Sequence, residues 1–528
     1  MSLTPAASPR PLNLAAILEA MADAVPNRNA LVTIDREYTY AEIDERATRL
    51  ANHLVSLGVA PGDHVAVHSA NRVEWVDAFY GCMKAGASPI NVNYKYLHDE
   101  LAHVYRNADC VAAIVAPEHV AALDALDLPK LRHRVVIGPA YDAALAAASA
   151  TRLAGRPADD RYVLYTGGTT GHPKGVIWRH EDLIRAALNA VRFGAPLESV
   201  ERLAAEAAAN ENPMVMLACG PMMHAGSQWI LGNAHVAGAT VAFYTEPSFH
   251  ADKILDLVQK AGVVSLTFLG DAMGRPVAEA ILAEPDRWDL SSLAAVSNGA
   301  APLSEGVRAE IRRALPGRYI LDTYGSSESG AAASKIDDGT DDPAGAPNFA
   351  AGPDIEVFDE NLNPCPVGVE GMLARSGPIP LGYYKDPVKT AATFKRIDGV
   401  RWAVPGDVAR REPDGSVTVL GRGSACINTG GEKVHPEEVE AVLLRHDDVF
   451  DAAVVGTPHE RWGQQVTALV RLRAGATATE DDLRGHARGL ISNYKVPKRF
   501  LFVAEIPRTA VGKIDYPAGS TLAAELLA

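Results

Sequence analysis

The hydrophobic pattern along the first part of the chain alternates between two periods. In "TYAEIDERATRLANHLVSLG", apolar residues such as Ile43, Leu50 and Leu54 recur at helical spacing, and the next stretch, "HVAVHSA", is typical of a strand. "WVDAFYGCMKAGASPINVN" repeats this order, and further strands are expected in "VAAIVAP", "HRVVIG" and "GATVAFY". This alternation predicts α/β layers around a largely parallel sheet.

The pattern changes twice in the second half of the chain. Residues 330–382 are rich in Gly, Pro and Asp and include the strand-like "IEVFD", which indicates a small β subdomain. Periodicity returns after Gly421: "HPEEVEAVLLRHDDV" predicts a helix that starts at Pro436, and "VFDAAVVG" and "QQVTALVRL" predict strands. We therefore expect a large N-terminal α/β region and a small α+β C-terminal domain, with the boundary near Arg422.

One segment resembles a membrane span because it carries no Asp, Glu, Lys or Arg from Asn212 to Thr245. Prolines, glycines and polar side chains interrupt it throughout, including Pro221, Gly226 and His224. We interpret it as buried core beside a pocket in a soluble protein, with peripheral membrane contact left open.

Length and composition limit the class of protein to which the chain can belong. A chain of 528 residues exceeds the usual size of one core, so two or more domains are expected. Its 50 Lys and Arg against 65 Asp and Glu give a net charge of −15, which argues against a nucleic-acid partner and favours a small molecule. Five scattered cysteines and an N-terminus without a secretion signal predict a cytoplasmic protein.

"YVLYTGGTTGHPKGV" joins a strand to a glycine-rich turn, as a phosphate-binding loop does. The common Gly-Lys-Ser/Thr pattern is absent, because Pro173 precedes Lys174 and Gly175 follows it. The threonine hydroxyls of this stretch and the Lys174 ammonium suit the end of a polyphosphate. Taken alone, the stretch is equally typical of a surface turn with a solvated lysine.

Four other features are weak when each is taken alone. Glu328, in "LDTYGSSESG", suits Mg²⁺ but is also a common solvated loop residue. Asp407 suits a ribose diol, yet aspartate is also a turn former. Lys513 lies on a glycine-flanked loop, where a solvated lysine is the usual finding. "AVSNGAAPLS" offers small residues whose backbone can approach a flat ring.

The ordered set of motifs is far more specific than any member. "YTGGTTGHPKG", "YGSSE", Gly406-Asp407, Gly421-Arg422, "NTGGEKVHPEEVE" and "PRTAVGKID" follow the order and approximate spacing of the adenylate-forming superfamily, which the chain resembles over nearly its whole length. That superfamily comprises acyl-CoA synthetases, peptide-synthetase adenylation domains and beetle luciferases. "FLGDAMGRP" and "GRGSACINTGGEKVHPEEVE" look most like bacterial fatty-acyl or steroid side-chain CoA ligases.

The resemblance implies an ATP- and Mg²⁺-dependent enzyme that forms an acyl-AMP and transfers the acyl group to coenzyme A. It implies an N-terminal adenylation core at residues 1–421, a hinge at 422–425 and a mobile C-terminal domain at 426–528. It makes Lys513, Thr166, Glu328 and His224 the catalytic residues, with Glu328 and Thr166 at the metal. The implied nucleotide-binding residues are Thr166, Gly167, Gly168, Thr169, Thr170 and Lys174 at the phosphates, Gly299, Ala300, Ala301 and Tyr324 at the adenine, Ser327 at the α-phosphate, Asp407 and Arg422 at the ribose, and also Asp322, Gly325, Ser326 and Lys513.

The expected acyl pocket is lined by small and apolar residues, and it contains no Arg or Lys that could hold a second carboxylate. It is expected to include His224, Ala225, Gly226, Trp229, Gly325 and Ser329. A core histidine is the less favoured alternative for His224. The face implied for CoA transfer contains Gly430, Gly431 and Lys433, and Ser424 stands where the family usually has a hinge Asp or Lys.

Several alternatives stay open at this point. In one alternative, the acid is an aryl acid and not a fatty or steroid acid. In a second, the acyl group is transferred to an acceptor other than CoA, although no carrier domain follows residue 528. A non-catalytic nucleotide or acyl sensor would not need Lys513. A kinase-like phosphotransferase would need the missing Gly-Lys-Ser/Thr loop. A homodimer is the default expectation for the assembly.

Overall fold

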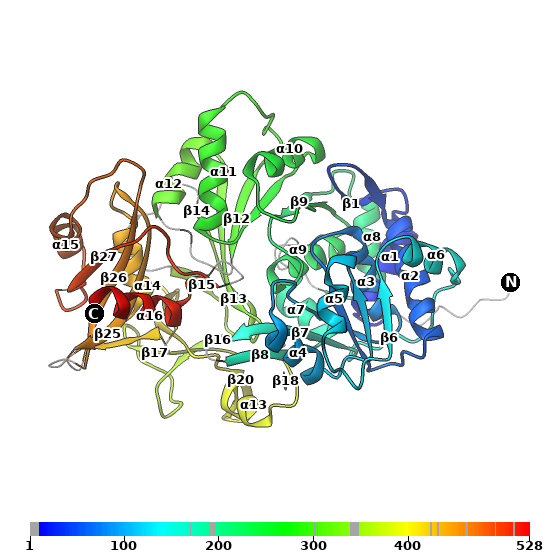
Figure 1. Cartoon of the computed structure of the whole chain (residues 1–528). Coiled ribbons are helices and arrows are strands. Elements are labelled where there is room, and N and C mark those ends of the chain that lie inside the picture. The colour runs from blue at the N-terminus through cyan, green and yellow to red at the C-terminus, as the bar shows by residue number, and fades with distance from the viewer. Residues whose placement is uncertain are drawn as a thin grey trace.

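The structure is a computed structural model that describes residues 10–168, 171–189, 192, 197–299, 303, 305–337, 348–422, 425–429, 432–459, 463–491, 493–509 and 513–528. Within this part of the chain the strands form four sheets. Figure 1 shows the N-terminal elements on one side of the molecule and the C-terminal elements on the other. The mixed α/β class predicted from the sequence is confirmed.

The N-terminal sheet has the order β4-β3-β5-β6, and all of its strand pairs are parallel. Helix α2 begins at a capping box in which Thr39 and Glu42 bind each other's backbone N–H groups. The predicted alternation of helix and strand is confirmed here. The elements are α1 (Leu14–Ala24), α2 (Tyr40–Ser56), β3 (His64–His68), α3 (Val73–Lys84), β4 (Ser88–Asn91), α4 (His98–Asn107), β5 (Ala112–Val115), α5 (Val120–Asp124), β6 (His133–Val136) and α6 (Pro139–Ala147).

The largest sheet is parallel in only one part. Its parallel part runs β13-β12-β11-β9-β10-β1, whereas β14 and the strands that follow it pair antiparallel. The parallel part agrees with the sheet expected for the first part of the chain. The antiparallel part contains the segment expected to form a small β subdomain, and short turns such as that between β13 and β14 join antiparallel neighbours. The parallel part comprises β1 (Asn29–Val32), β9 (Val215–Ala218), β10 (Thr240–Phe243), β11 (Ser265–Phe268), β12 (Ala295–Gly299) and β13 (Tyr319–Ser326). The antiparallel part comprises β2 (Glu37–Thr39), β14 (Gly330–Asp337), β15 (Asn348–Ala351), β16 (Ile355–Phe358), β17 (Glu370–Arg375), β19 (Phe394–Ile397), β20 (Val400–Ala403), β21 (Asp407–Arg411) and β22 (Val417–Arg422).

Helices cover the parallel part of this sheet. They are α7 (His180–Ala187), α8 (Val200–Ala209), α9 (Ala225–Val236), α10 (Ala251–Ala261), α11 (Asp271–Ala283) and α12 (Glu305–Ala314), and α13 (Pro387–Thr393) lies beside the antiparallel part. The uncharged segment from Asn212 to Thr245 forms β9, α9 and β10, most of which is buried, so its interpretation as core is confirmed. No described helix is both long and apolar enough to cross a bilayer.

The glycine-rich stretch lies in a hairpin of the third sheet, β18-β8-β7. The strand extends into the glycines as β7 (Arg161–Gly168) and the chain returns as β8 (Gly171–Arg179), with Thr166 opposite Lys174. Strand β18 (Gly382–Tyr383) pairs with β8 from the other side. Gly175 allows the close pairing, because a Cβ there would lie 2.8 Å from the Tyr165 ring.

The C-terminal region has a separate core under a five-stranded sheet. Its elements are β23 (Ile427–Thr429), β24 (Glu432–Val434), α14 (Pro436–Leu443), β25 (Val449–His459), β26 (Gly463–Leu472), α15 (Glu480–Arg488), β27 (Arg499–Phe502) and α16 (Tyr516–Leu527). We call residues 425–528 the C-terminal unit. The helix predicted at Pro436 and both predicted strands are confirmed.

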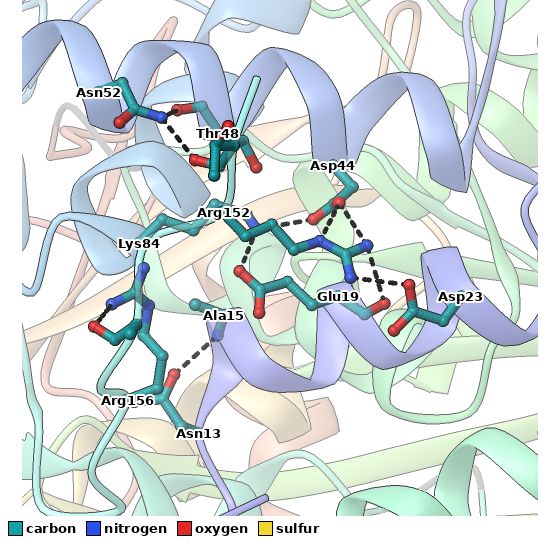
Figure 2. A network of polar contacts seen from close by, with 12 residues as sticks. Asn13, Ala15, Glu19, Asp23, Asp44, Thr48, Asn52, Lys84, Arg152 and Arg156 are labelled. Carbon is teal, nitrogen blue, oxygen red and sulfur yellow. Dashed lines mark hydrogen bonds and ion pairs between the residues drawn. The ribbon is translucent and has the colours of Figure 1, made fainter. Parts of the chain in front are cut away.

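A buried polar network joins the first helices (Figure 2). The Lys84 ammonium, with only 1% of its side chain exposed, lies 2.6 Å from the Glu19 carboxylate and 2.7 Å from that of Asp44. Arg152 connects Asp44 to Asp23, with 2.7 Å to each carboxylate. These pairs neutralise a buried cation and connect α1, α2 and α3 to a segment more than a hundred residues later.

Candidate active site

Two buried asparagines fix the irregular segment that leads into α9. Asn71 donates to the Gly220 carbonyl (3.2 Å) and accepts from the Met222 N–H (2.7 Å). Asn91, at the end of β4, donates to the Met223 carbonyl (2.6 Å). Side-chain amides thus satisfy backbone groups that have no strand partner, and they place His224 at the N-cap of α9.

His224 is largely buried, and its Nε2 has no hydrogen-bond partner among the described residues. Burial first, and then the positive charges of Lys513 and Lys95, lower the pKa of His224 to about 4. The imidazole is therefore neutral at pH 7. Lys513, in the C-terminal unit, is one of the two cations whose charge contributes to this lowering of the His224 pKa.

A side-chain hydrogen bond connects Tyr324, on β13, to Asp407, on β21. The Tyr324 hydroxyl donates to the Asp407 carboxylate, which is buried with 5% exposure. In the sheet Asp407 lies opposite Arg422, although the Arg422 side chain is outside the described residues. Three residues predicted to bind adenosine therefore lie on strands of the same sheet.

The turn after Tyr324 is tightly packed. A Cβ at Gly325 would lie 2.1 Å from the Gly330 carbonyl oxygen, so only glycine fits there. The Ser326 N–H donates to the Ser329 hydroxyl (3.0 Å), and Trp178 Nε1 donates to the Ser327 carbonyl (3.0 Å). Arg375 donates to the carbonyls of Ser329 and Ala331. These contacts hold the loop that carries Glu328 in one conformation.

Tyr383 joins the predicted metal ligand to the predicted phosphate loop. Its hydroxyl donates to Glu328 Oε1 (2.8 Å), and the Lys174 ammonium lies 5.9 Å from the centre of its ring. Lys174 forms an ion pair with Asp386 (2.7 Å). His103 Nε2 donates to the Pro173 carbonyl (3.0 Å), so the base of the hairpin is held from both sides.

Asp322 has partners of its own. Its carboxylate pairs with Arg308 (2.7 Å) and accepts from Asn298 Nδ2 (3.1 Å). Asn298 also accepts from the Gly270 N–H (2.9 Å) and so connects β12 to the start of α11. Gly299 ends β12 next to this group.

The other residues predicted for the acyl pocket lie near His224 or on the Tyr324 turn. Ala225, Gly226 and Trp229 occupy the first turns of α9, and a Cβ at Gly226 would lie 3.5 Å from Leu269. Some predicted residues cannot be placed. Thr169, Thr170, Ala300, Ala301, Ser424, Gly430 and Gly431 lie outside the described residues, and only the backbone is described for Gly167, Gly168, Arg422 and Lys433.

Sequence reasoning missed Tyr383, Asp386, Trp178, Arg375 and His103 as parts of the site. Tyr383 and Asp386 stand in "GYYKDPVKTAATF", a motif that entered only through the resemblance. A usable signal is Gly382, whose φ of +151° and close approach to Thr390 require glycine just before Tyr383.

Comparison with known proteins identifies the class. Residues 18–384 match the AMP-binding enzyme family, and residues 438–513 match the AMP-binding enzyme C-terminal domain. The chain belongs to the AMP-binding enzyme family, which confirms the resemblance stated from the motifs.

Particular relatives cover nearly the whole chain. It is 43% identical to a 3-oxocholest-4-en-26-oate–CoA ligase of Rhodococcus rhodochrous, over 96% of this chain and 95% of that protein. It is 42% identical to a medium/long-chain-fatty-acid–CoA/3-oxocholest-4-en-26-oate–CoA ligase of Mycobacterium marinum, with the same coverage. Among solved structures, the anthranilate CoA ligase AuaEII in complex with anthranoyl-AMP has a TM-score of 0.84 at 25% identity and covers 98% of this chain and 99% of its own. ATP-bound MatB from Rhodopseudomonas palustris has a TM-score of 0.83 at 27% identity, with 97% and 99% coverage.

Proposed function

We propose that this AMP-forming acid–CoA ligase activates a hydrophobic monocarboxylic acid, either a medium- or long-chain fatty acid or a steroid side-chain acid. The observation that carries the proposal is the mostly buried segment from Asn212 to Thr245, which has no charged side chain and places His224 at the N-cap of α9. The names of the relatives from Rhodococcus rhodochrous and Mycobacterium marinum support this class of acid.

In the proposed first step, a carboxylate oxygen of the acid bonds to the α-phosphorus of ATP while the bond from that phosphorus to pyrophosphate breaks. Both reactants are anions, so the protein must position them and offset their charge. The Lys513 ammonium would lie between the carboxylate and the α-phosphate. Thr166 and Lys174 would bind the β- and γ-phosphates across the hairpin, where they are paired in register.

The remaining nucleotide contacts follow from the same geometry. Asp407 would accept hydrogen bonds from the ribose hydroxyls, and Tyr324 would flank the adenine. Mg²⁺ is usually bound by one or two carboxylates together with substrate phosphates, and Glu328 presents one such carboxylate, oriented by Tyr383. When bound, the ion would supply further charge neutralisation at the phosphates.

In the proposed second step, the CoA sulfur bonds to the acyl carbon, the thiol proton is lost to solvent and AMP leaves. Gly430, Gly431 and Lys433 would line the approach of the thiol after residues 426–528 rotate about a hinge at 422–425.

We further propose a cytoplasmic homodimer. The free cysteines, three of them buried, suit a reducing compartment, and light scattering of the purified protein would test the dimer.

Mass spectrometry of the reaction products tests the function. Purified protein would receive ATP, Mg²⁺ and CoA with dodecanoate, 3-oxocholest-4-en-26-oate or benzoate in separate reactions. We expect acyl-CoA and AMP with dodecanoate, the steroid acid or both. Thioester from benzoate alone would contradict the acid class, and acyl-AMP without thioester would contradict CoA as the acceptor.

A further inference from the structure

A cluster of charged and aromatic residues connects the C-terminal unit to α11 and α12. Glu310, on α12, accepts from Arg275 of α11 (3.1 Å) and from Arg473 of the C-terminal unit (2.9 Å). The Arg275 and Glu310 side chains are 3% and 9% exposed, whereas Arg473 is 32% exposed. One carboxylate thus bridges a buried arginine of the large region and a half-buried arginine of the C-terminal unit.

Phe450 adds an aromatic contact at the same place. The Arg275 guanidinium carbon lies 4.8 Å from the centre of the Phe450 ring, and that of Arg471 lies 4.4 Å from it. Cations at such distances are attracted to the ring face. Nearby, the Leu444 carbonyl would lie 3.2 Å from a Cβ at Gly306, so the two backbones are also close. Figure 1 shows α12 beside the C-terminal sheet.

These residues belong to rigid elements that also position Lys513. Phe450 and Arg471 lie on β25 and β26, which pair along most of their length, and Arg473 directly follows β26. Helix α16 packs on β25 and begins three residues after Lys513. A contact that fixes the orientation of β25 and β26 on α12 therefore also fixes where the Lys513 loop lies.

We propose that Arg275, Glu310, Phe450, Arg471 and Arg473, together the α12 latch, position the C-terminal unit for acyl-AMP formation and separate before thioester formation. The proposal rests on the proposed role of Lys513. The Arg275–Glu310 pair stays with the large region as a preformed half-site. The half-exposed Arg473 pair and a single aromatic ring are contacts weak enough to break in each catalytic cycle.

The test measures the two half-reactions separately in Arg473→Gln, which loses the bridge to Glu310 and keeps the side-chain stem. We expect dodecanoate-dependent ATP–pyrophosphate exchange to fall about two- to fivefold, because the orientation that presents Lys513 becomes less populated. The conversion of synthetic dodecanoyl-AMP and CoA to dodecanoyl-CoA should stay within twofold or rise. Arg473→Lys should recover part of the exchange activity.

Arg484→Gln is the matched control, because Arg484 pairs with Asp481 (2.6 Å) inside the C-terminal unit. It should change neither half-reaction. Phe450→Leu provides a second variant with the same expected split, and thermal melts would check that each variant is folded. Equal loss in both half-reactions, or no loss in either, would overturn the latch. If the wild-type enzyme accepts only 3-oxocholest-4-en-26-oate, the same half-reactions are measured with that acid and its adenylate; failure to make a thioester from either acid would instead count against the proposed function.

Discussion

In the proposed mechanism, the ion pair between Lys174 and Asp386 would compete with ATP for the Lys174 ammonium group. In the described hairpin, Lys174 lies opposite Thr166. Its ammonium is 2.7 Å from the Asp386 carboxylate, and the Lys174 and Asp386 side chains are 39% and 29% exposed. The pair also lowers the pKa of Asp386, so the carboxylate is fully ionised at neutral pH. A triphosphate that binds Lys174 must displace this carboxylate and approach its negative charge.

We predict that Asp386→Asn lowers the KM for ATP and strengthens inhibition by pyrophosphate. Half-exposed ion pairs contribute about 0.2–1 kcal/mol, which corresponds to about a 1.4- to fivefold change in each constant. Asp386 Oδ1 also caps α13 by accepting from the Lys389 N–H (2.8 Å), and asparagine keeps an oxygen for this bond. The melting temperature should therefore change little.

Steady-state kinetics with ATP varied, and pyrophosphate as product inhibitor, would measure both constants. Lys389→Gln is the control, since this residue contributes its backbone N–H and not its side chain to the cap. A higher KM for ATP in Asp386→Asn would refute the reasoning, because it would mean that Asp386 orients Lys174 toward the phosphates rather than competing with them.

Three further predictions follow from the site. Lys513→Ala should lower acid-dependent pyrophosphate exchange by about a hundred- to a thousandfold while calorimetric ATP binding is kept; normal exchange would exclude the proposed role. Gly325→Ala should lower the free energy of unfolding by about 1–3 kcal/mol in urea, because its Cβ would meet the Gly330 carbonyl, whereas Gly485→Ala, with open space on α15, should not destabilise. The folded-state pKa of His224, about 4, lies below its unfolded value of about 6.5, so the unfolded state binds more protons between these values and stability falls as pH drops from about 6.5 to about 4. His224→Asn should reduce this loss in urea titrations at pH 7 and pH 5, and an unchanged difference would contradict the assignment.

The parts of the fold that local periodicity determines were predictable. Helix α2 and strand β3 follow from apolar spacing and a capping box, both of which lie within one short stretch. The β subdomain after Gly330 was predicted from its composition, but the order of its strands was not, since that order depends on pairing between distant segments. The same applies to the site: Tyr383 reaches Glu328 only because β18 pairs with β8 across some two hundred residues of sequence. The order of the motifs predicts the residues that we propose to carry the chemistry. The residues that orient them are brought into place by tertiary pairing, which the motifs do not predict.

The buried lysine of Figure 2 has a consequence for the order in which the chain folds. Lys84 needs Glu19 and Asp44 before it can leave water, and Asp44 in turn pairs with Arg152, which also binds the Glu19 carbonyl 133 residues away in sequence. When a nascent chain has emerged only as far as α3, its partly formed interior holds two carboxylates and one cation. Burying this excess negative charge costs free energy, which the Arg152 guanidinium would offset. The N-terminal helices consequently complete their packing only after synthesis has passed residue 152, and a fragment that stops short of it should remain open to proteases.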